Sequence, residues 1–142
     1  MRLAEFMTRE VYTLRAEDPL SEALEFLRER KVRHIPILDA QRNLVGVLTD
    51  RDIKRATPSP LAPGQREVWE RVMNETPLEK VMSRDPTTAT PENTLEEALE
   101  TFVAERIGCL PVLRERQLVG IVTAQDLFKA TLEVLRRARR AR

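Results

Sequence analysis

Apolar residues recur at helical spacing in two segments of the chain. The first stripe consists of Leu20, Ala23, Leu24 and Leu27, and the second consists of Leu95, Ala98, Leu99 and Phe102. This spacing predicts two amphipathic helices. Asp18, with Pro19 at the first helical position, is expected to cap the first helix, and Asn93 is expected to cap the second.

Two apolar segments separated by a polar turn follow each of these helices. They predict strands at 34–38 and 44–48 in the first half, and at 109–113 and 117–122 in the second. A short strand is also expected at 11–13, and further helices are expected from Thr49 and from about 124 toward 137. Each half therefore predicts the order β-α-β-β-α, and the fold class is α/β (α+β).

The same motif closes both halves. The apolar runs 44–48 and 118–122 each contain a central glycine, and each leads into Thr-x-x-Asp, first as Thr49 and Asp52 and then as Thr123 and Asp126. Further upstream, Met7 and Pro36 are matched by Met82 and Pro111, and one residue is deleted in the second hairpin loop. A two-fold internal repeat therefore determines the architecture.

A Pro-rich segment at 57–64 separates the repeats and cannot continue a helix. An amphipathic helix is expected at 65–74, with Val68, Trp69, Val72 and Met73 on its packing side. The predicted organisation is repeat 1 at 1–56, a linker with an insert helix at 57–77, repeat 2 at 78–135, and an Arg-rich tail at 136–142. A chain of 142 residues suits one unit made of two small halves.

Composition narrows the function classes. The 24 Lys and Arg nearly balance the 23 Asp and Glu, yet arginines crowd 136–142, so the rest of the chain is acidic and nucleic-acid binding is not favoured. A solvated tail is expected. No stretch resembles a signal peptide or a membrane span, and a single cysteine forms no internal disulfide, so we expect a cytoplasmic protein that does not bind membranes.

No enzyme is predicted. One histidine and one cysteine make no zinc site, and neither a Walker A loop nor Gly-x-Gly-x-x-Gly occurs. Asp50 and Asp52 have no partner base or nucleophile in the sequence.

On the duplicated motifs and the helical insert, the chain resembles a tandem pair of cystathionine β-synthase (CBS) domains, a Bateman module, from Leu3 to about Leu135. The resemblance implies two repeats packed about a pseudo-two-fold axis. It also implies clefts between the repeats that bind AMP, ADP or ATP, with S-adenosylmethionine or NAD as further ligands. A homodimer and a regulated partner protein are expected, and no catalytic cofactor is required.

The Thr49–Asp52 and Thr123–Asp126 pairs are the candidate ligand-binding residues. A carboxylate suits the ribose hydroxyls, and a hydroxyl at a helix start suits a phosphate. Thr-x-x-Asp is also a capping box, and one threonine can serve both roles. By resemblance, Arg33 and His34 would meet phosphates, although a packing role for His34 stays equally open.

The two sites are expected to be unequal. Arg51 lies inside the first motif where the second has Gln125, and the second repeat carries Gly108 and Cys109 in place of the Arg33-His34 pair. Cys109 is expected to be a small buried residue. By family analogy, an adenine slot would be lined by Val11, Thr13, Ile35, Val47, Thr88 and Ile121, although each of these, taken singly, is also an ordinary core candidate.

The leading hypothesis is a stand-alone regulatory CBS-pair module that senses an adenosine-containing ligand and signals to a partner or changes its self-association. The alternative is a non-catalytic interaction or structural module with degenerate sites, resembling the accessory domain of IMP dehydrogenase. A third is nucleic-acid binding through the Arg-rich tail, which would depend steeply on salt.

Overall fold

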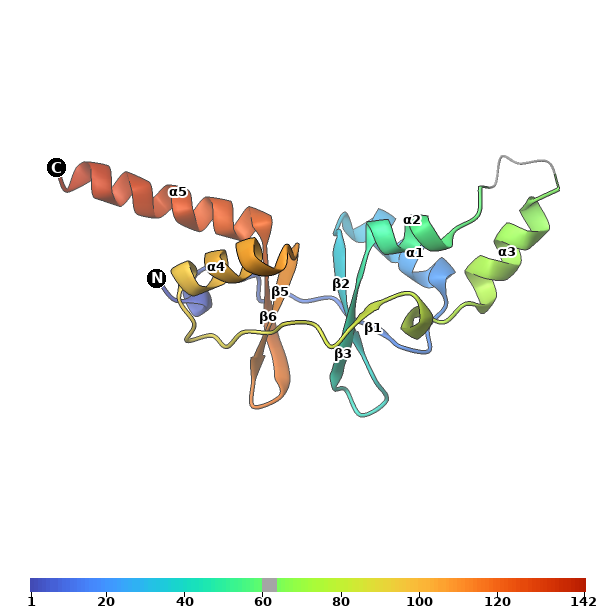
Figure 1. The fold of residues 1–142 in the computed structure, drawn as a ribbon. Coiled ribbons are helices and arrows are strands. Elements are labelled where there is room, and N and C mark those ends of the chain that lie inside the picture. The colour runs from blue at the N-terminus through green and yellow to red at the C-terminus, as the bar shows by residue number, and fades with distance from the viewer. Residues whose placement is uncertain (60–63) are drawn as a thin grey trace. The chain divides into compact units, whose positions relative to one another are not determined.

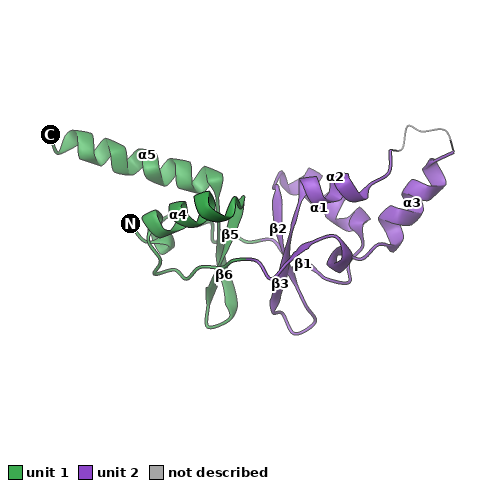
Figure 2. Cartoon of the chain, viewed as in Figure 1, with its two compact units in different colours: residues 1–11, 87–142 green, residues 12–86 purple. Residues whose placement is uncertain are grey.

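The computed structural model describes residues 1–59 and 64–142, and it combines helices with two β-sheets (Figure 1). The predicted mixed α+β class is confirmed. The chain divides into two compact units: unit 1 contains residues 1–11 and 87–142, and unit 2 contains residues 12–86 (Figure 2). The predicted linker at 57–64 lies partly outside the described residues.

Unit 2 is built on a sheet with the order β1-β2-β3-β4. Its strands are β1 (Leu14–Arg15), β2 (His34–Leu38), β3 (Leu44–Thr49) and β4 (Ser83–Arg84). β1 runs parallel to β2, and the other pairs are antiparallel. The strand expected at 11–13 was placed wrongly, because the buried Leu14 pairs with Ile37.

Helices α1 (Leu20–Arg30), α2 (Asp50–Ala56) and α3 (Arg66–Glu75) and the short helix η2 (Leu78–Lys80) complete unit 2. Its core gathers residues from all of these elements, including Leu20, Ile35, Ile37, Leu48, Ile53, Met73 and Leu78. The predicted insert helix is confirmed as α3, which buries Met73 and packs Trp69 and Val72 against this core. Val68 is 43% exposed, so its assignment to the packing side was wrong.

Unit 1 contains η1 (Leu3–Glu5), α4 (Leu95–Glu105), the hairpin β5 (Cys109–Arg114) and β6 (Gln117–Thr123), and α5 (Ala124–Arg140). Two single-residue bridges extend the hairpin: Thr8 pairs antiparallel with Ile121, and Ala89 pairs parallel with Val112. In the repeat alignment these bridges match Ser83 on Val47 and Leu14 on Ile37 in unit 2. Both units therefore have the same strand order.

The repeated methionines explain the repeated glycines. A Cβ on Gly46 would clash with the Met82 sulfur and lie 2.9 Å from the Ser83 carbonyl, and a Cβ on Gly120 would lie 2.6 Å from the Met7 sulfur. Met82 belongs to the second sequence repeat but packs in unit 2, and Met7 belongs to the first but packs in unit 1. The compact units therefore exchange the first segment of each sequence repeat. The repeat boundaries 1–56 and 78–135 remain a prediction about sequence.

Both predicted helix caps were one residue too early. Pro19 and Thr94 are the N-cap residues, whereas the carboxylate of Asp18 accepts a hydrogen bond from Arg15 N and the amide oxygen of Asn93 accepts one from Thr90 N, each at 2.7 Å. These side chains close the preceding turns instead, a use of Asp and Asn that competes with capping.

Helix α5 continues through most of the predicted tail, to Arg140, and its last two turns are exposed. The tail expected at 136–142 is therefore solvent-exposed, as predicted, and it is helical as far as Arg140. Within 1–59 and 64–142, no helix is both long and apolar enough to cross a membrane.

Candidate functional site

The Asp126 carboxylate lies half-buried at the start of α5, a helix of 17 residues. Thr123 caps this helix: its N–H donates to Asp126 Oδ2 at 2.9 Å, and Asp126 N donates back to Thr123 Oγ1 at 3.5 Å. The Thr8 hydroxyl lies 3.1 Å from both carboxylate oxygens. Two hydroxyls and a carboxylate thus meet at one helix terminus.

Sequence reasoning missed Thr8. The signal was available, because Thr8 follows Met7 as Ser83 follows the matching Met82, so a hydroxyl follows the methionine in both repeats. The sequence did not reveal that the Thr8 hydroxyl donates a hydrogen bond to the aspartate of the other repeat. The exchange of the methionine segments brings Thr8 to Asp126.

The Asp52 carboxylate forms the same capping box with less support. Thr49 N donates to Asp52 Oδ2 at 2.9 Å, and Asp52 N donates to Thr49 Oγ1 at 3.1 Å. Ser83 is exposed, and among the described residues no hydrogen bond joins it to Asp52. The capping interpretation is therefore confirmed in both units, while a ligand role stays a prediction.

His34 pairs with Thr49 across β2 and β3, so it lies at the Asp52 site. Burial lowers the pKa of His34 below its ordinary 6.5, with Arg33 lowering it further and with Asp50 and Asp52 opposing the shift. Near neutral pH the ring is uncharged and offers one donor and one acceptor. The permanent positive charges next to this site belong to Arg33 and Arg51, both exposed.

In unit 1 the matching positions are uncharged. Cys109 replaces His34 and is buried, as predicted, and burial raises the pKa of its thiol to about 12. The cysteine is thus a neutral packing residue rather than a reactive thiolate. Gly108 and Gln125 supply no charge either. The difference in charge between the two sequence repeats is therefore also a difference between the two units.

The candidates for the adenine slot differ in their exposure. Ile35, Val47 and Ile121 are buried in their own units, with exposures of 0%, 6% and 7%. Val11 and Thr13 are half-buried, and Thr88 is exposed. The three buried residues contribute to packing, and the other three retain surface that a ligand can touch. Among the described residues, no group of three or more His, Cys, Asp or Glu side chains is arranged to hold a metal ion.

Comparisons with known proteins identify relatives over nearly the whole chain. The family described as "CBS domain" matches residues 3–59 and 78–133. A CBS domain-containing protein of Dictyostelium discoideum is 30% identical over 92% of this chain and 91% of its own length. The CBS domain-containing protein YhcV of Bacillus subtilis is 33% identical over 85% of this chain and 79% of its own length.

A partial match is also informative. The inosine-5'-monophosphate dehydrogenase of Korarchaeum cryptofilum is 33% identical over 89% of this chain, but the chain spans only 24% of that enzyme. The likeness therefore concerns one region of the enzyme.

Solved structures agree with the fold. A Vibrio cholerae protein named for acetoin utilization (AcuB) is 32% identical, with a TM-score of 0.77 over 96% of this chain and 93% of its own. CBSX2, solved with AMP, is 24% identical with a TM-score of 0.76 over 94% and 97% of the two chains. The CBS domain pair of MJ0100, solved with 5-methylthioadenosine and S-adenosyl-L-methionine, is 23% identical with a TM-score of 0.75 over 92% and 95%.

Proposed function

The chain belongs to the CBS domain family, and on that premise we propose that it is a stand-alone, non-catalytic regulatory module that binds an adenosine-containing ligand, AMP, ADP or ATP first. The observation that carries the proposal is the half-buried Asp126 carboxylate between the Thr8 and Thr123 hydroxyls at the start of α5. The Thr49–Asp52 pair is a second, weaker site.

The chemistry of the site suits a nucleoside phosphate. An ionised carboxylate accepts hydrogen bonds from the two ribose hydroxyls, and the threonine hydroxyls donate to phosphate oxygens once they turn away from Asp126. The positive end of the α5 dipole also favours an anion there. Support comes from CBSX2 and the MJ0100 pair, whose structures were solved with AMP and with S-adenosyl-L-methionine and 5-methylthioadenosine.

The proposal is tested by thermal unfolding with AMP, ADP, ATP, S-adenosylmethionine and NAD at equal concentrations. A ligand present at one hundred times its dissociation constant adds about 2.7 kcal/mol to the free energy of unfolding. We expect a clear rise in Tm for at least one adenine nucleotide. If none of the five ligands raises Tm, the proposal is wrong.

A matched variant separates binding from capping. Asp126→Ala removes a capping box and the candidate ligand group, whereas Glu97→Ala removes the Thr94–Glu97 capping box of α4 in the same unit. Both variants lower Tm, but only Asp126→Ala should abolish the rise caused by the ligand. Equal ligand responses in the two variants would leave Asp126 as a cap alone.

One observation favours a second candidate, a protein-interaction module with degenerate sites. Both oxygens of Asp126 already accept hydrogen bonds inside unit 1, from Thr8 and Thr123, so the carboxylate is satisfied without a ligand. The likeness to one region of IMP dehydrogenase is consistent with this role. Such a module shows no nucleotide response, and its partner is then sought by cross-linking.

Signalling requires two states with different ligand affinities. We expect the ligand to regulate one of two steps in the cytoplasm. The first is formation of a homodimer, and the second is docking of a partner protein. Sedimentation velocity with and without the nucleotide that raises Tm tests the first possibility, and an unchanged sedimentation coefficient would point to the second.

A further inference from the structure

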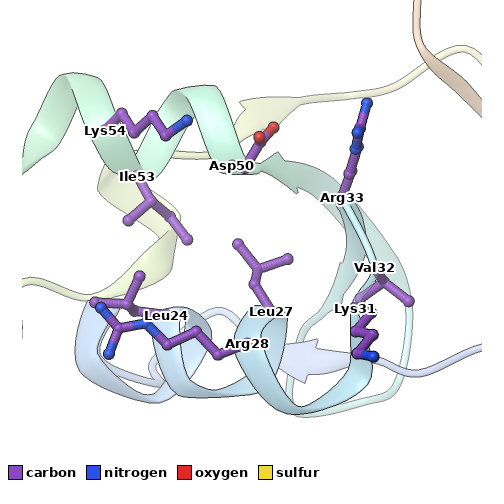
Figure 3. A pocket seen from close by; sticks show the side chains of 9 residues that line it. All are labelled: Leu24, Leu27, Arg28, Lys31, Val32, Arg33, Asp50, Ile53 and Lys54. Carbon is purple, nitrogen blue, oxygen red and sulfur yellow. The ribbon is translucent and has the colours of Figure 1, made fainter.

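A cavity of about 300 Å³ opens between α1 and α2 of unit 2 (Figure 3). Its apolar lining consists of Leu24, Leu27, Val32 and Ile53, and its charged residues are Arg28, Lys31, Arg33, Lys54 and Asp50. Figure 3 shows Leu27 and Ile53 pointing toward each other across the cavity, with Arg28 and Lys54 on different sides of it. The cavity thus has an apolar interior and a charged rim.

The rim carries excess positive charge. Four cations face one carboxylate, and all four cationic side chains are exposed. Elsewhere in unit 2, Arg15 and Arg66 pair with glutamates, yet among the described residues none of the four rim cations forms an ion pair. Their charge is therefore available to a bound anion.

The fold does not require this chemistry. In the repeat alignment, Leu27, Arg28 and Lys54 are matched in unit 1 by Phe102, Val103 and Phe128. Arg33 and Asp50 are matched by Gly108 and Ala124. Val103 and Phe128 are 79% and 68% exposed, so the same face of the same framework carries no cation at these positions. Lys31 is matched by Arg106, so three of the four rim cations are found in unit 2 alone.

We infer that this cavity binds a small amphipathic anion, namely a carboxylate with a short acyl body. The acyl body replaces water against Leu27 and Ile53, and the carboxylate is met by Arg28 and Lys54. A volume of about 300 Å³ is at the lower end of small-molecule sites, which excludes a large ligand from the interior. The site shares Arg33 with the surroundings of Asp52, but it requires neither the Asp52 nor the Asp126 carboxylate.

The test is an NMR titration of the full ¹⁵N-labelled chain with octanoate. Octylamine provides the same apolar body with the opposite charge, and acetate provides the anion without the body. We expect saturable amide shifts at 31–33 and 50–54 with octanoate, and affinities at least about tenfold weaker for the two control compounds. Equal affinity for octylamine would overturn the inference, as would octanoate shifts confined to the exposed apolar residues of α5.

Variants locate the site. Leu27→Phe places in the cavity the residue found at the matching position of repeat 2 and should abolish octanoate binding. Arg28→Gln and Lys54→Gln should each weaken it about fivefold, whereas Arg55→Gln, on α2 but outside the cavity lining, should not change it. If Leu27→Phe does not fold, the glutamine variants decide, and unchanged affinity in both refutes the inference.

The two binding proposals fail separately. Asp126→Ala should retain octanoate binding, and Arg28→Gln should retain the nucleotide-induced rise in Tm. Loss of octanoate binding in a folded Asp126→Ala protein would contradict the assignment to unit 2.

Discussion

The two units share a framework but differ in the side chains around it. In both, a methionine packs on a strand glycine, a Pro-containing hairpin forms the sheet, and a threonine caps the following helix. Around this framework unit 2 carries Arg33, His34 and Lys54 where unit 1 carries Gly108, Cys109 and Phe128. The comparison teaches that residues which maintain the fold and residues which set its surface chemistry occupy separate positions in this repeat.

The aspartates show the opposite imbalance. Asp126 accepts hydrogen bonds from Thr8 as well as Thr123, while among the described residues Asp52 is hydrogen-bonded to Thr49 alone. Unit 2 thus has more cations around a less supported carboxylate, and unit 1 has a better supported carboxylate with fewer cations. Each unit can therefore be perturbed independently.

The largest expected effect breaks the shared framework. Gly46→Ala and Gly120→Ala should each destabilise the protein by about 1 to 3 kcal/mol, because an added Cβ overpacks the methionine and the neighbouring backbone. Gly46→Ala should cost more, since the Ser83 carbonyl lies at 2.9 Å from its Cβ and the Thr8 carbonyl at 3.1 Å from that of Gly120. Urea unfolding measures both losses.

A second substitution checks the cause. Adding Met82→Ala to Gly46→Ala should relieve only part of the strain, because the Ser83 carbonyl belongs to the backbone. A loss below about 0.5 kcal/mol for either glycine variant would place that glycine among ordinary surface sites and contradict the packing argument.

The next effect separates the two aspartates. Asp52→Ala should cost about 1 kcal/mol through loss of a cap, and Asp126→Ala should cost about 1 kcal/mol more because it also loses the Thr8 hydrogen bond. A double-mutant cycle of Asp126→Ala with Thr8→Val, followed by urea unfolding, isolates that difference. Equal losses for the two aspartates would show that the Thr8 contact contributes nothing.

A smaller effect compares the hairpin turns. Arg116 has φ 70° in the tight β5–β6 turn, and Arg42 has φ 67° in the longer β2–β3 turn. Glycine adopts such angles without a Cβ clash, which favours the folded state, but it also gives the unfolded chain more conformational freedom. The net effect of Arg116→Gly and of Arg42→Gly should be a stabilisation of about 0.5 kcal/mol each. A fall in Tm for either variant would mean that its arginine side chain has a stabilising contact.

The smallest effect is a dependence on pH confined to unit 2. Burial lowers the pKa of His34, so below pH 6.5 the unfolded chain binds a proton before the folded protein does. The contribution of the neutral His34 to the free energy of unfolding is therefore fully present above pH 6.5. It declines as the pH falls toward the pKa of His34 in the folded protein. His34→Cys, which introduces the residue of unit 1, should flatten the stability profile between about pH 7.5 and 5.5.

Urea midpoints across that range provide the measurement. Cys109→Ser is the control, because burial keeps the Cys109 thiol protonated throughout the range and its pKa is about 12. If the wild-type and His34→Cys slopes coincide, His34 does not couple folding to protons.

Much of the fold was predictable from the sequence, since the apolar patterns and repeated motifs located both hairpins, two helices in each repeat and the insert helix. The family resemblance is confirmed by the match at 3–59 and 78–133. Prediction from local sequence failed where one residue type suits two different local structures. Asp18 and Asn93 suit turns as well as caps, and only their hydrogen bonds to Arg15 and Thr90 decide between them.

The site was predictable in part. Thr-x-x-Asp located both capping boxes and Cys109 was correctly expected to be buried, yet Thr8 was missed because its partner lies in the other repeat. The cavity between α1 and α2 was also missed, because its cations come from two helices and a connection with no shared motif. A contact between residues far apart in the sequence produces no periodic pattern in the segments that contain them.

The composition of unit 1 has a consequence for how the protein is made. Residues 12–86 form unit 2 as one continuous stretch, whereas unit 1 needs 1–11 together with 87–142. During synthesis, all of unit 2 is translated before residues 87–142, so Leu3 and Met7 can pack in unit 1 only after β6 has been made. Residues 1–11 therefore precede unit 2 in the chain but complete their packing after it.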